Sequence, residues 1–154
     1  MIENMITELT MLGTGNATVT KCYNTCFTIK IGKNILLVDA GGGNGILRQL
    51  EKAGIAISEI HDMFVTHDHI LGAVWMVRIV MQKMLSGQYT GTFRVYGHDK
   101  VLEVLGWICR KLLPAKIVAL IGSAVEFREV KDGETFEAGG LCLQCFDIAS
   151  TKEK

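Results

Sequence analysis

The sequence has 154 residues, 49% of them hydrophobic, and its 16 basic and 16 acidic residues give a formal net charge of zero. This balance excludes an intrinsically disordered chain, which combines low hydrophobicity with high charge. Neutrality also gives no support to a large nucleic-acid-binding surface, although a local basic patch could still bind a nucleic acid. A chain of this length can bury one core, so we expect a single domain over residues 1–154.

Cysteine content and apolar runs bear on the compartment. The five cysteines are irregularly spaced and do not resemble a disulfide framework, which favours a reducing, cytoplasmic setting. The longest apolar run, residues 70–85, is interrupted by Arg78, Gln82 and Lys83 and is too short for a membrane span. The first residues do not resemble a signal peptide. We therefore expect no association with a membrane.

The first half of the sequence predicts four strands and one helix. Glycine-containing turns at residues 13–16 and 32–34 separate the first three strands. Residues 35–38 are apolar at every position, as expected of a strand that is covered on both faces. The expected elements are strands at residues 6–12, 26–31, 35–38 and 63–66, and a helix at residues 46–53 that Gly54 ends.

The second half continues the alternation of helices and strands. The expected elements are helices at residues 70–85 and 99–113, the second capped by Asp99 and stopped by Pro114, and strands at residues 92–96, 125–130, 135–137 and 141–148. Two stripes at helical spacing are expected to be core: Trp75, Met76, Ile79 and Val80, then Val101, Leu105, Ile108 and Leu112. The alternation predicts an α/β fold with a mixed sheet.

Three metal-capable side chains, His67, Asp68 and His69, directly follow the expected strand at residues 63–66. Ligands of α/β proteins commonly bind beyond the carboxyl ends of strands. Two imidazoles and a carboxylate suit zinc, and also iron or manganese. The alternative is a solvated loop, because three adjacent residues do not easily reach one ion.

The order of several short motifs resembles the metallo-β-lactamase superfamily, and most closely its ribonuclease Z-like and phosphodiesterase-like members. These motifs are Leu12-Gly13-Thr14-Gly15-Asn16, Ile35-Leu36-Leu37-Val38-Asp39-Ala40-Gly41, Val65-Thr66-His67 and Asp68-His69-Ile70-Leu71-Gly72. The resemblance covers residues 5–148. It implies an αββα sandwich with a mixed sheet, of which the second half is truncated or missing here.

The match to the family motif, Thr-His-x-His-x-Asp-His-x-x-Gly, is incomplete. In the preferred alignment three residues are lost: His67 matches the first histidine, Asp68 and His69 match the Asp-His pair, and Gly72 matches the glycine that lets the next helix pack. In the rival alignment His67 and His69 are the first two ligands and the Asp-His pair is missing. A later ligand histidine of the family falls on Ala149, unless the wrong strand has been aligned.

The resemblance implies a metal-dependent hydrolase that attacks a phosphodiester or ester-like substrate with metal-bound hydroxide. It assigns His67, Asp68 and His69 as ligands of zinc, manganese or iron, with Asp68 also as the catalytic residue and with Asp39 and Gly72 in support. The missing ligands leave open an alternative: a non-catalytic, metal-poor, truncated or engineered chain that acts as a binding or assembly module. Apolar surface left uncovered by an absent second half favours a homo-oligomer.

Other candidate residues have plainer readings. His98 follows a strand and is expected at the start of a helix rather than facing a substrate, and His61 is expected to be structural or exposed, at the end of the strand opposite the motif. Cys142 and Cys145 are expected to be buried and to face opposite sides of a strand, so that they do not share an ion. The glycines at residues 41–45 lack the Lys-Ser or Lys-Thr of a P-loop, which disfavours a nucleotide-binding domain.

Overall fold

The fold is a six-stranded mixed sheet between a layer of helices and a two-stranded hairpin. A computed structural model describes residues 7–149. The sheet has the order β1-β2-β3-β4-β5-β6, with antiparallel pairing from β1 to β3 and parallel pairing from β3 to β6. Its strands are β1 (Thr7–Gly13), β2 (Cys26–Ile31), β3 (Asn34–Val38), β4 (Ile60–Phe64), β5 (Phe93–Gly97) and β6 (Val125–Glu129).

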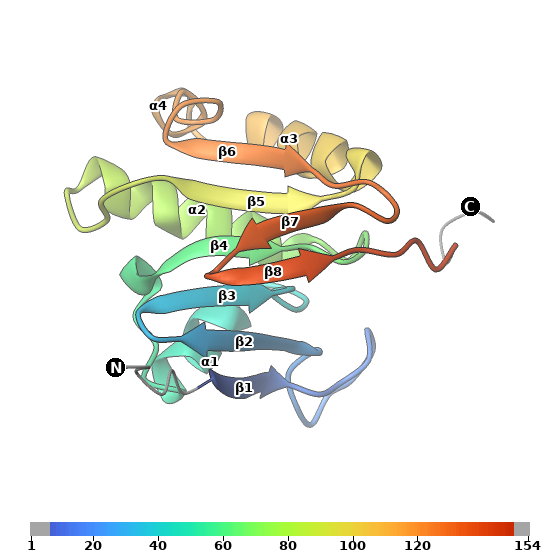
Figure 1. Ribbon diagram of the computed structural model, residues 1–154. Coiled ribbons are helices and arrows are strands. Elements are labelled where there is room, and N and C mark those ends of the chain that lie inside the picture. The colour runs from blue at the N-terminus through green and yellow to red at the C-terminus, as the bar shows by residue number, and fades with distance from the viewer. Residues whose placement is uncertain (1–6, 150–154) are drawn as a thin grey trace, which may run out of the picture.

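The helices cover one face of this sheet (Figure 1). They are α1 (Gly45–Lys52), α2 (Leu71–Leu85), α3 (Asp99–Leu112) and the short α4 (Ala115–Val118), with a 3-10 turn η1 (Ile57–Glu59) before β4. The strands from β3 to β6 are added in one direction across the sheet. Because crossovers between parallel strands are right-handed, the connecting helices α1, α2 and α3 then lie on the same face.

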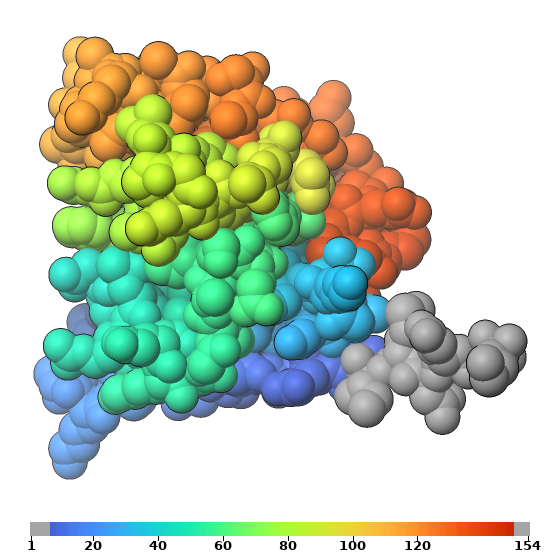
Figure 2. All heavy atoms as spheres, turned by 90° about the vertical axis from the view of Figure 1, so that its left-hand side faces the viewer, coloured from blue at the N-terminus to red at the C-terminus, as the bar shows by residue number. Residues whose placement is uncertain are grey.

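A hairpin of β7 (Thr135–Ala138) and β8 (Leu141–Gln144) lies on the opposite face. Figure 2 shows the same layers from the side, with the red hairpin and the green helical segments on opposite sides of the molecule. The strand β3 contributes Ile35 and Leu37 to the core under the helices, and Leu36 and Val38 to the core under the hairpin. The expectation that β3 is covered on both faces is therefore confirmed.

The predicted α/β class and mixed sheet are confirmed, and most boundaries lie within one or two residues of the expected ones. Ile6, the expected start of the first strand, lies outside the described residues. The fourth strand is Ile60–Phe64 rather than residues 63–66. Its polar residues His61 and Asp62 interrupt the apolar run that the prediction relied on, but both are hydrogen-bonded within the fold.

Two other expectations about the second half are wrong, and one short helix was missed. The last strand ends at Gln144, and beyond it Phe146 and Ile148 are exposed by 68% and 82%. Leu112, at the end of the predicted core stripe of α3, is 70% exposed, because the buried face continues from Leu105 and Cys109 to Leu113 and leaves Leu112 beside it. Helix α4 was not predicted, although Pro114 supplies the fixed φ that often precedes a helix. No helix among the described residues is long and apolar enough to cross a membrane.

Gly72, near the start of α2, lets the helix approach the loop after β3. Its N–H donates to the carbonyl oxygen of Gly41 at 3.0 Å, and a Cβ atom added to it would lie 1.9 Å from the carbonyl oxygen of Ala40. A side chain cannot be accommodated there unless the helix moves away from this loop. This close approach is a physical reason for a glycine at the position that the family motif reserves for one.

We expect Gly72→Ala to lower the free energy of unfolding by about 1–3 kcal/mol, the usual cost of overpacking, because backbone and not a flexible side chain blocks the new methyl group. Urea denaturation followed by circular dichroism measures the loss. Gly43→Ala is the matched control, because no atom lies within 4 Å of a Cβ added at Gly43. Equal stability of the two variants would contradict the proposed packing role.

Candidate metal centre and adjoining pocket

The two histidines of the motif lie in the loop between β4 and α2, beyond the carboxyl ends of the parallel strands. Their rings meet edge to face, with the centroids 4.7 Å apart. Nε2 of His67 lies 3.1 Å from Nδ1 of His69, which is hydrogen-bonding distance. Both residues are at least partly exposed, so the pair is open to solvent and to ligands.

Asp39 holds the segment that carries these histidines. It directly follows β3 and has a φ of 55°, a left-handed conformation that aspartate tolerates better than most residues. Its N–H donates to the carbonyl oxygen of Phe64 at 2.8 Å. Its carboxylate accepts from the N–H of Thr66 at 2.9 Å and from the Thr66 hydroxyl at 2.5 Å. Asp39 therefore joins the end of β3 to the loop after β4.

These hydrogen bonds determine which nitrogen of His67 carries its proton. The Thr66 hydroxyl has one proton and donates it to the Asp39 carboxylate. The same hydroxyl lies 2.8 Å from Nδ1 of His67, so it can only accept there. This arrangement favours the tautomer of His67 that carries its proton on Nδ1 and presents the lone pair of Nε2 toward His69. Orientation of an imidazole through its second nitrogen is typical of metal-binding histidines.

The spacing of the pair fits part of a metal site. Two nitrogens that bind one tetrahedral zinc at about 2.0–2.1 Å lie roughly 3.3 Å apart, close to the separation seen here. A zinc site, however, takes three or four protein ligands. Within residues 7–149, no group of three or more His, Cys, Asp or Glu side chains is placed to hold a metal ion. The described residues alone do not complete the coordination of a metal.

The predicted site residues thus fall into different places. His67 and His69 come together, and Asp39 is hydrogen-bonded to the segment that carries them. Gly72 packs α2 against the loop after β3, and Asp68 is exposed. Ala149 follows the hairpin with a φ of 58°, while Ser150 lies outside the described residues. The metal-ligand roles remain predictions.

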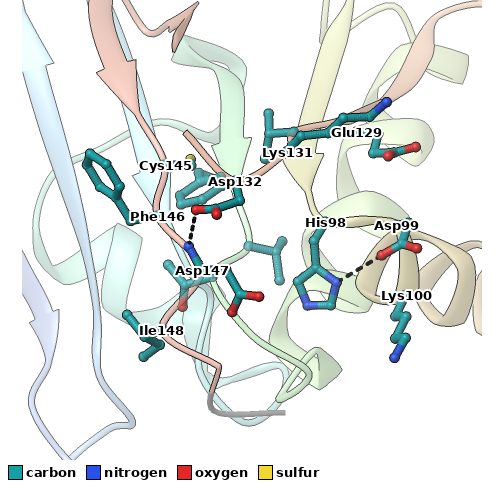
Figure 3. A pocket seen from close by; sticks show the side chains of 14 residues that line it. His98, Asp99, Lys100, Glu129, Lys131, Asp132, Cys145, Phe146, Asp147 and Ile148 are labelled. Atoms are coloured by element: carbon teal, nitrogen blue, oxygen red, sulfur yellow. Dashed lines mark hydrogen bonds and ion pairs between the residues drawn. The ribbon is translucent and has the colours of Figure 1, made fainter. Parts of the chain in front are cut away.

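A pocket of about 420 Å³ adjoins the histidine pair. Thr66 contributes to its lining, and so do residues after β5, after β6 and after β8. His98, at the end of β5, points into this pocket in Figure 3, and its Nδ1 lies 3.5 Å from a carboxylate oxygen of Asp99. The backbone N–H of Lys100, and then His98, hold the pKa of the exposed Asp99 carboxyl below its usual range.

The tail after β8 forms one wall of the pocket. The Asp132 carboxylate accepts from the N–H of Asp147 at 2.9 Å, and the Asp147 carboxylate accepts from the N–H of Ala149 at 2.6 Å. The sequence prediction missed this wall, and it also missed Thr66 as the link between Asp39 and His67. The position of Thr66 next to His67 in the motif was the one available signal for that link.

The remaining candidates are His98, His61 and the two cysteines Cys142 and Cys145. His98 is at the start of α3, as expected, and makes no side-chain capping hydrogen bond. Nδ1 of His61 lies 2.9 Å from the Tyr89 hydroxyl and 3.2 Å from the carbonyl oxygen of Thr92, at the opposite end of β4. Cys142 is exposed rather than buried, because it is on the outer face of the hairpin, whereas Cys145 is half-buried.

The glycine-rich loop before α1 is filled by the Tyr23 ring. The Tyr23 hydroxyl lies 2.8 Å from the carbonyl oxygen of Ala40 and 2.9 Å from that of Gly43. A Cβ atom added to Gly41 or Gly45 would collide with this ring. The glycines therefore provide room for a tyrosine, which accounts for them without a bound phosphate.

The layered fold and the motif at the end of β4 define a member of the metallo-β-lactamase superfamily. Comparisons with known proteins support this class. More narrowly, the chain belongs to the family described as "Anti-Pycsar protein Apyc1", whose sequence profile matches residues 7–154. The superfamily is the one that the ordered motifs indicated.

Curated relatives with similar sequences are ribonucleases Z. That of Pyrococcus furiosus is 36% identical over 102 residues, which are 64% of this chain and 31% of the relative. That of Pyrococcus horikoshii is 44% identical over 96 residues, or 60% of this chain and 29% of the relative. This chain thus spans about a third of the length of these relatives.

Solved structures with the same fold have lower sequence identity. A diphosphatase of the PhnP family has a TM-score of 0.69 and 17% identity, covering 90% of this chain and 56% of that one. The metallo-β-lactamase fold protein YhfI of Bacillus subtilis has a TM-score of 0.63 and 18% identity, covering 86% of this chain and 50% of that one. The chain therefore spans about half of the fold in these structures.

Proposed function

We propose that this protein acts as a metal-dependent phosphodiester hydrolase, with His67, Asp68 and His69 contributing metal ligands. The observation that carries the proposal is the hydrogen-bonded chain from Asp39 through Thr66 to His67, which presents a lone pair on Nε2 beside Nδ1 of His69. The neighbouring ribonucleases Z act on a nucleic acid by name, and the PhnP-family neighbour is named a diphosphatase.

The metal, when bound, would polarise the phosphate and lower the pKa of a water molecule, which supplies hydroxide at neutral pH. Zinc is the first candidate, and manganese and iron also suit these ligand types. This chain's own residues orient the first ligand: Asp39 fixes the direction of the Thr66 hydroxyl, and Thr66 fixes the tautomer of His67. Residues 7–149 assemble no group of three ligands, so the proposal includes the supply of further ligands from elsewhere in the protein assembly.

Zinc binding by equilibrium dialysis and hydrolysis of bis(4-nitrophenyl) phosphate test this proposal. We expect His67→Ala and His69→Ala each to lower the bound zinc and to abolish hydrolysis, because each removes one of the two adjacent nitrogens. His61→Gln is the matched control, since His61 is at the other end of β4, and it should leave both measurements unchanged. Zinc binding that is indifferent to His67 and His69 would rule out the site.

The alternative is a non-catalytic binding or assembly module. The absence of a three-ligand group within residues 7–149 favours it, and so do exposed apolar side chains such as Leu9, Met11 and Trp107. It predicts a stably folded protein that binds no stoichiometric metal and hydrolyses no phosphodiester. Analytical ultracentrifugation of the same samples tests the expected homo-oligomer, and a cytoplasmic location remains a prediction from composition.

A further inference from the structure

The pocket beside the histidine pair contains a second histidine site that the proposed metal centre does not use. His98 and Thr66 line the same pocket, and Thr66 is hydrogen-bonded to His67. The strands β4 and β5, which lead to His67 and His98, are parallel neighbours, with Phe64 paired to Tyr96. Both histidines therefore lie beyond the same end of the sheet, where these parallel strands have their carboxyl ends.

We propose that His98 is a catalytic residue that donates a proton to the leaving oxygen of the phosphodiester, and that the pocket holds the leaving group. This inference rests on the proposed hydrolase function. Water forms the new bond to phosphorus, the bond from phosphorus to the leaving oxygen breaks, and the imidazolium proton of His98 passes to that oxygen. The attacking water releases a proton to the solvent, and His98 takes up a proton from the solvent to restore the imidazolium.

The contacts of His98 suit this role better than a structural one. The residue is at the N-cap of α3, yet its side chain caps no backbone N–H group. Its side chain is 35% exposed, and its Nδ1 lies 3.5 Å from the Asp99 carboxylate. A proton on Nδ1 can thus face Asp99 while Nε2 remains available to the pocket. A carboxylate behind an imidazole orients the ring and stabilises the imidazolium, as in known acid-base catalysts.

The charges of the pocket indicate which part of a substrate enters it. The charged lining residues are Asp99, Glu129, Asp132 and Asp147, against Lys100 and Lys131. An excess of carboxylates disfavours the phosphate group itself. Carboxylates accept hydrogen bonds from hydroxyl and amino groups, as a nucleoside carries, and the pocket volume is in the range of small-molecule sites. The phosphate would then lie at the pocket edge, near Thr66 and the histidine pair.

The test compares two substrates that differ in the need for a proton. Hydrolysis of dithymidine monophosphate releases thymidine, an alcohol whose leaving oxygen requires a proton. Hydrolysis of thymidine 5′-(4-nitrophenyl phosphate) releases nitrophenolate, which requires none. With the full chain and added zinc, we expect His98→Gln to lower kcat on the dinucleotide about 100-fold or more, the usual contribution of a general acid, and to change the nitrophenyl ester less than about threefold. His61→Gln should change neither.

A second measurement does not depend on turnover. Thymidine, the expected leaving group, should shift the imidazole NMR signals of His98 and leave those of His61 unchanged. Equal losses on the two substrates, or an unchanged rate on the dinucleotide, would overturn the role of His98 while the hydrolase function stands. If the zinc-loaded wild-type protein hydrolyses neither substrate, the proposed function fails and the role of His98 fails with it.

Discussion

Asp39→Asn should reverse the donor and acceptor directions in the hydrogen-bonded chain from residue 39 through Thr66 to His67. An asparagine keeps the shape of the side chain, and it tolerates the left-handed backbone at this position. Its amide oxygen would still accept from the Thr66 N–H, but its amino group would now donate to the Thr66 hydroxyl. The hydroxyl proton would then turn to Nδ1 of His67 and move the imidazole proton to Nε2.

The variant should therefore bind zinc about 10–100-fold more weakly, the usual effect of changing a residue that orients a metal ligand. Two-dimensional ¹H–¹⁵N NMR of the imidazoles measures the tautomer of His67 without any metal, and zinc titration measures the affinity. Thr66→Ser is the control, because it keeps the hydroxyl that relays the orientation. A His67 that keeps its proton on Nδ1 in Asp39→Asn would show that the chain does not set the tautomer.

The second large effect concerns Asp62, the charged residue in the interior between the sheet and the hairpin. Asp62 is 5% exposed, and its carboxylate accepts two hydrogen bonds from Arg94, at 2.6 and 2.9 Å. It also accepts from the Gly139 N–H at 3.1 Å and from the Tyr96 hydroxyl at 3.3 Å. A single carboxylate thus links β4 and β5 to the turn between β7 and β8.

We expect Asp62→Ala to lower the free energy of unfolding by about 3 kcal/mol, the lower end for breaking a buried ion pair, because Arg94 remains 30% exposed and keeps some solvation. Urea denaturation measures this loss. The double variant Asp62→Leu with Arg94→Leu is the control: it removes both charges, so it should recover most of the stability. An Asp62→Ala protein as stable as the wild type would show that the hairpin does not depend on this link.

The same carboxylate predicts a dependence of stability on pH. Burial raises the pKa of Asp62, but the hydrogen bonds from Arg94 and Gly139 outweigh it, so the pKa is below the usual value. A depressed folded-state pKa stabilises the fold above the unfolded-state pKa, near pH 4, and this stabilisation is lost as the pH falls through the folded-state pKa. The acid loss of stability should be smaller in the double leucine variant.

The sequence by itself determined the class of fold and the superfamily. Apolar segments separated by turn residues were enough to predict the strands and helices. Each type of element repeats its hydrophobic residues at a fixed period. The ordered motifs at residues 12–16, 35–41 and 65–72 sufficed for the superfamily. Boundaries failed where polar residues are satisfied inside the fold, as at Asp62, since a charge in a strand looks like a strand end until its partner Arg94 is known.

Only the tertiary structure decided how the site residues relate to one another. Asp39 and Thr66 are 27 positions apart, and only the parallel pairing of β3 with β4 brings them into hydrogen-bonding distance. The pocket depends likewise on strand ends and a hairpin tail that are distant in sequence, so the sequence favoured a helix start for His98 over a position facing a substrate. Residue types and local spacing specify local elements, whereas proton positions and pocket walls arise from long-range contacts.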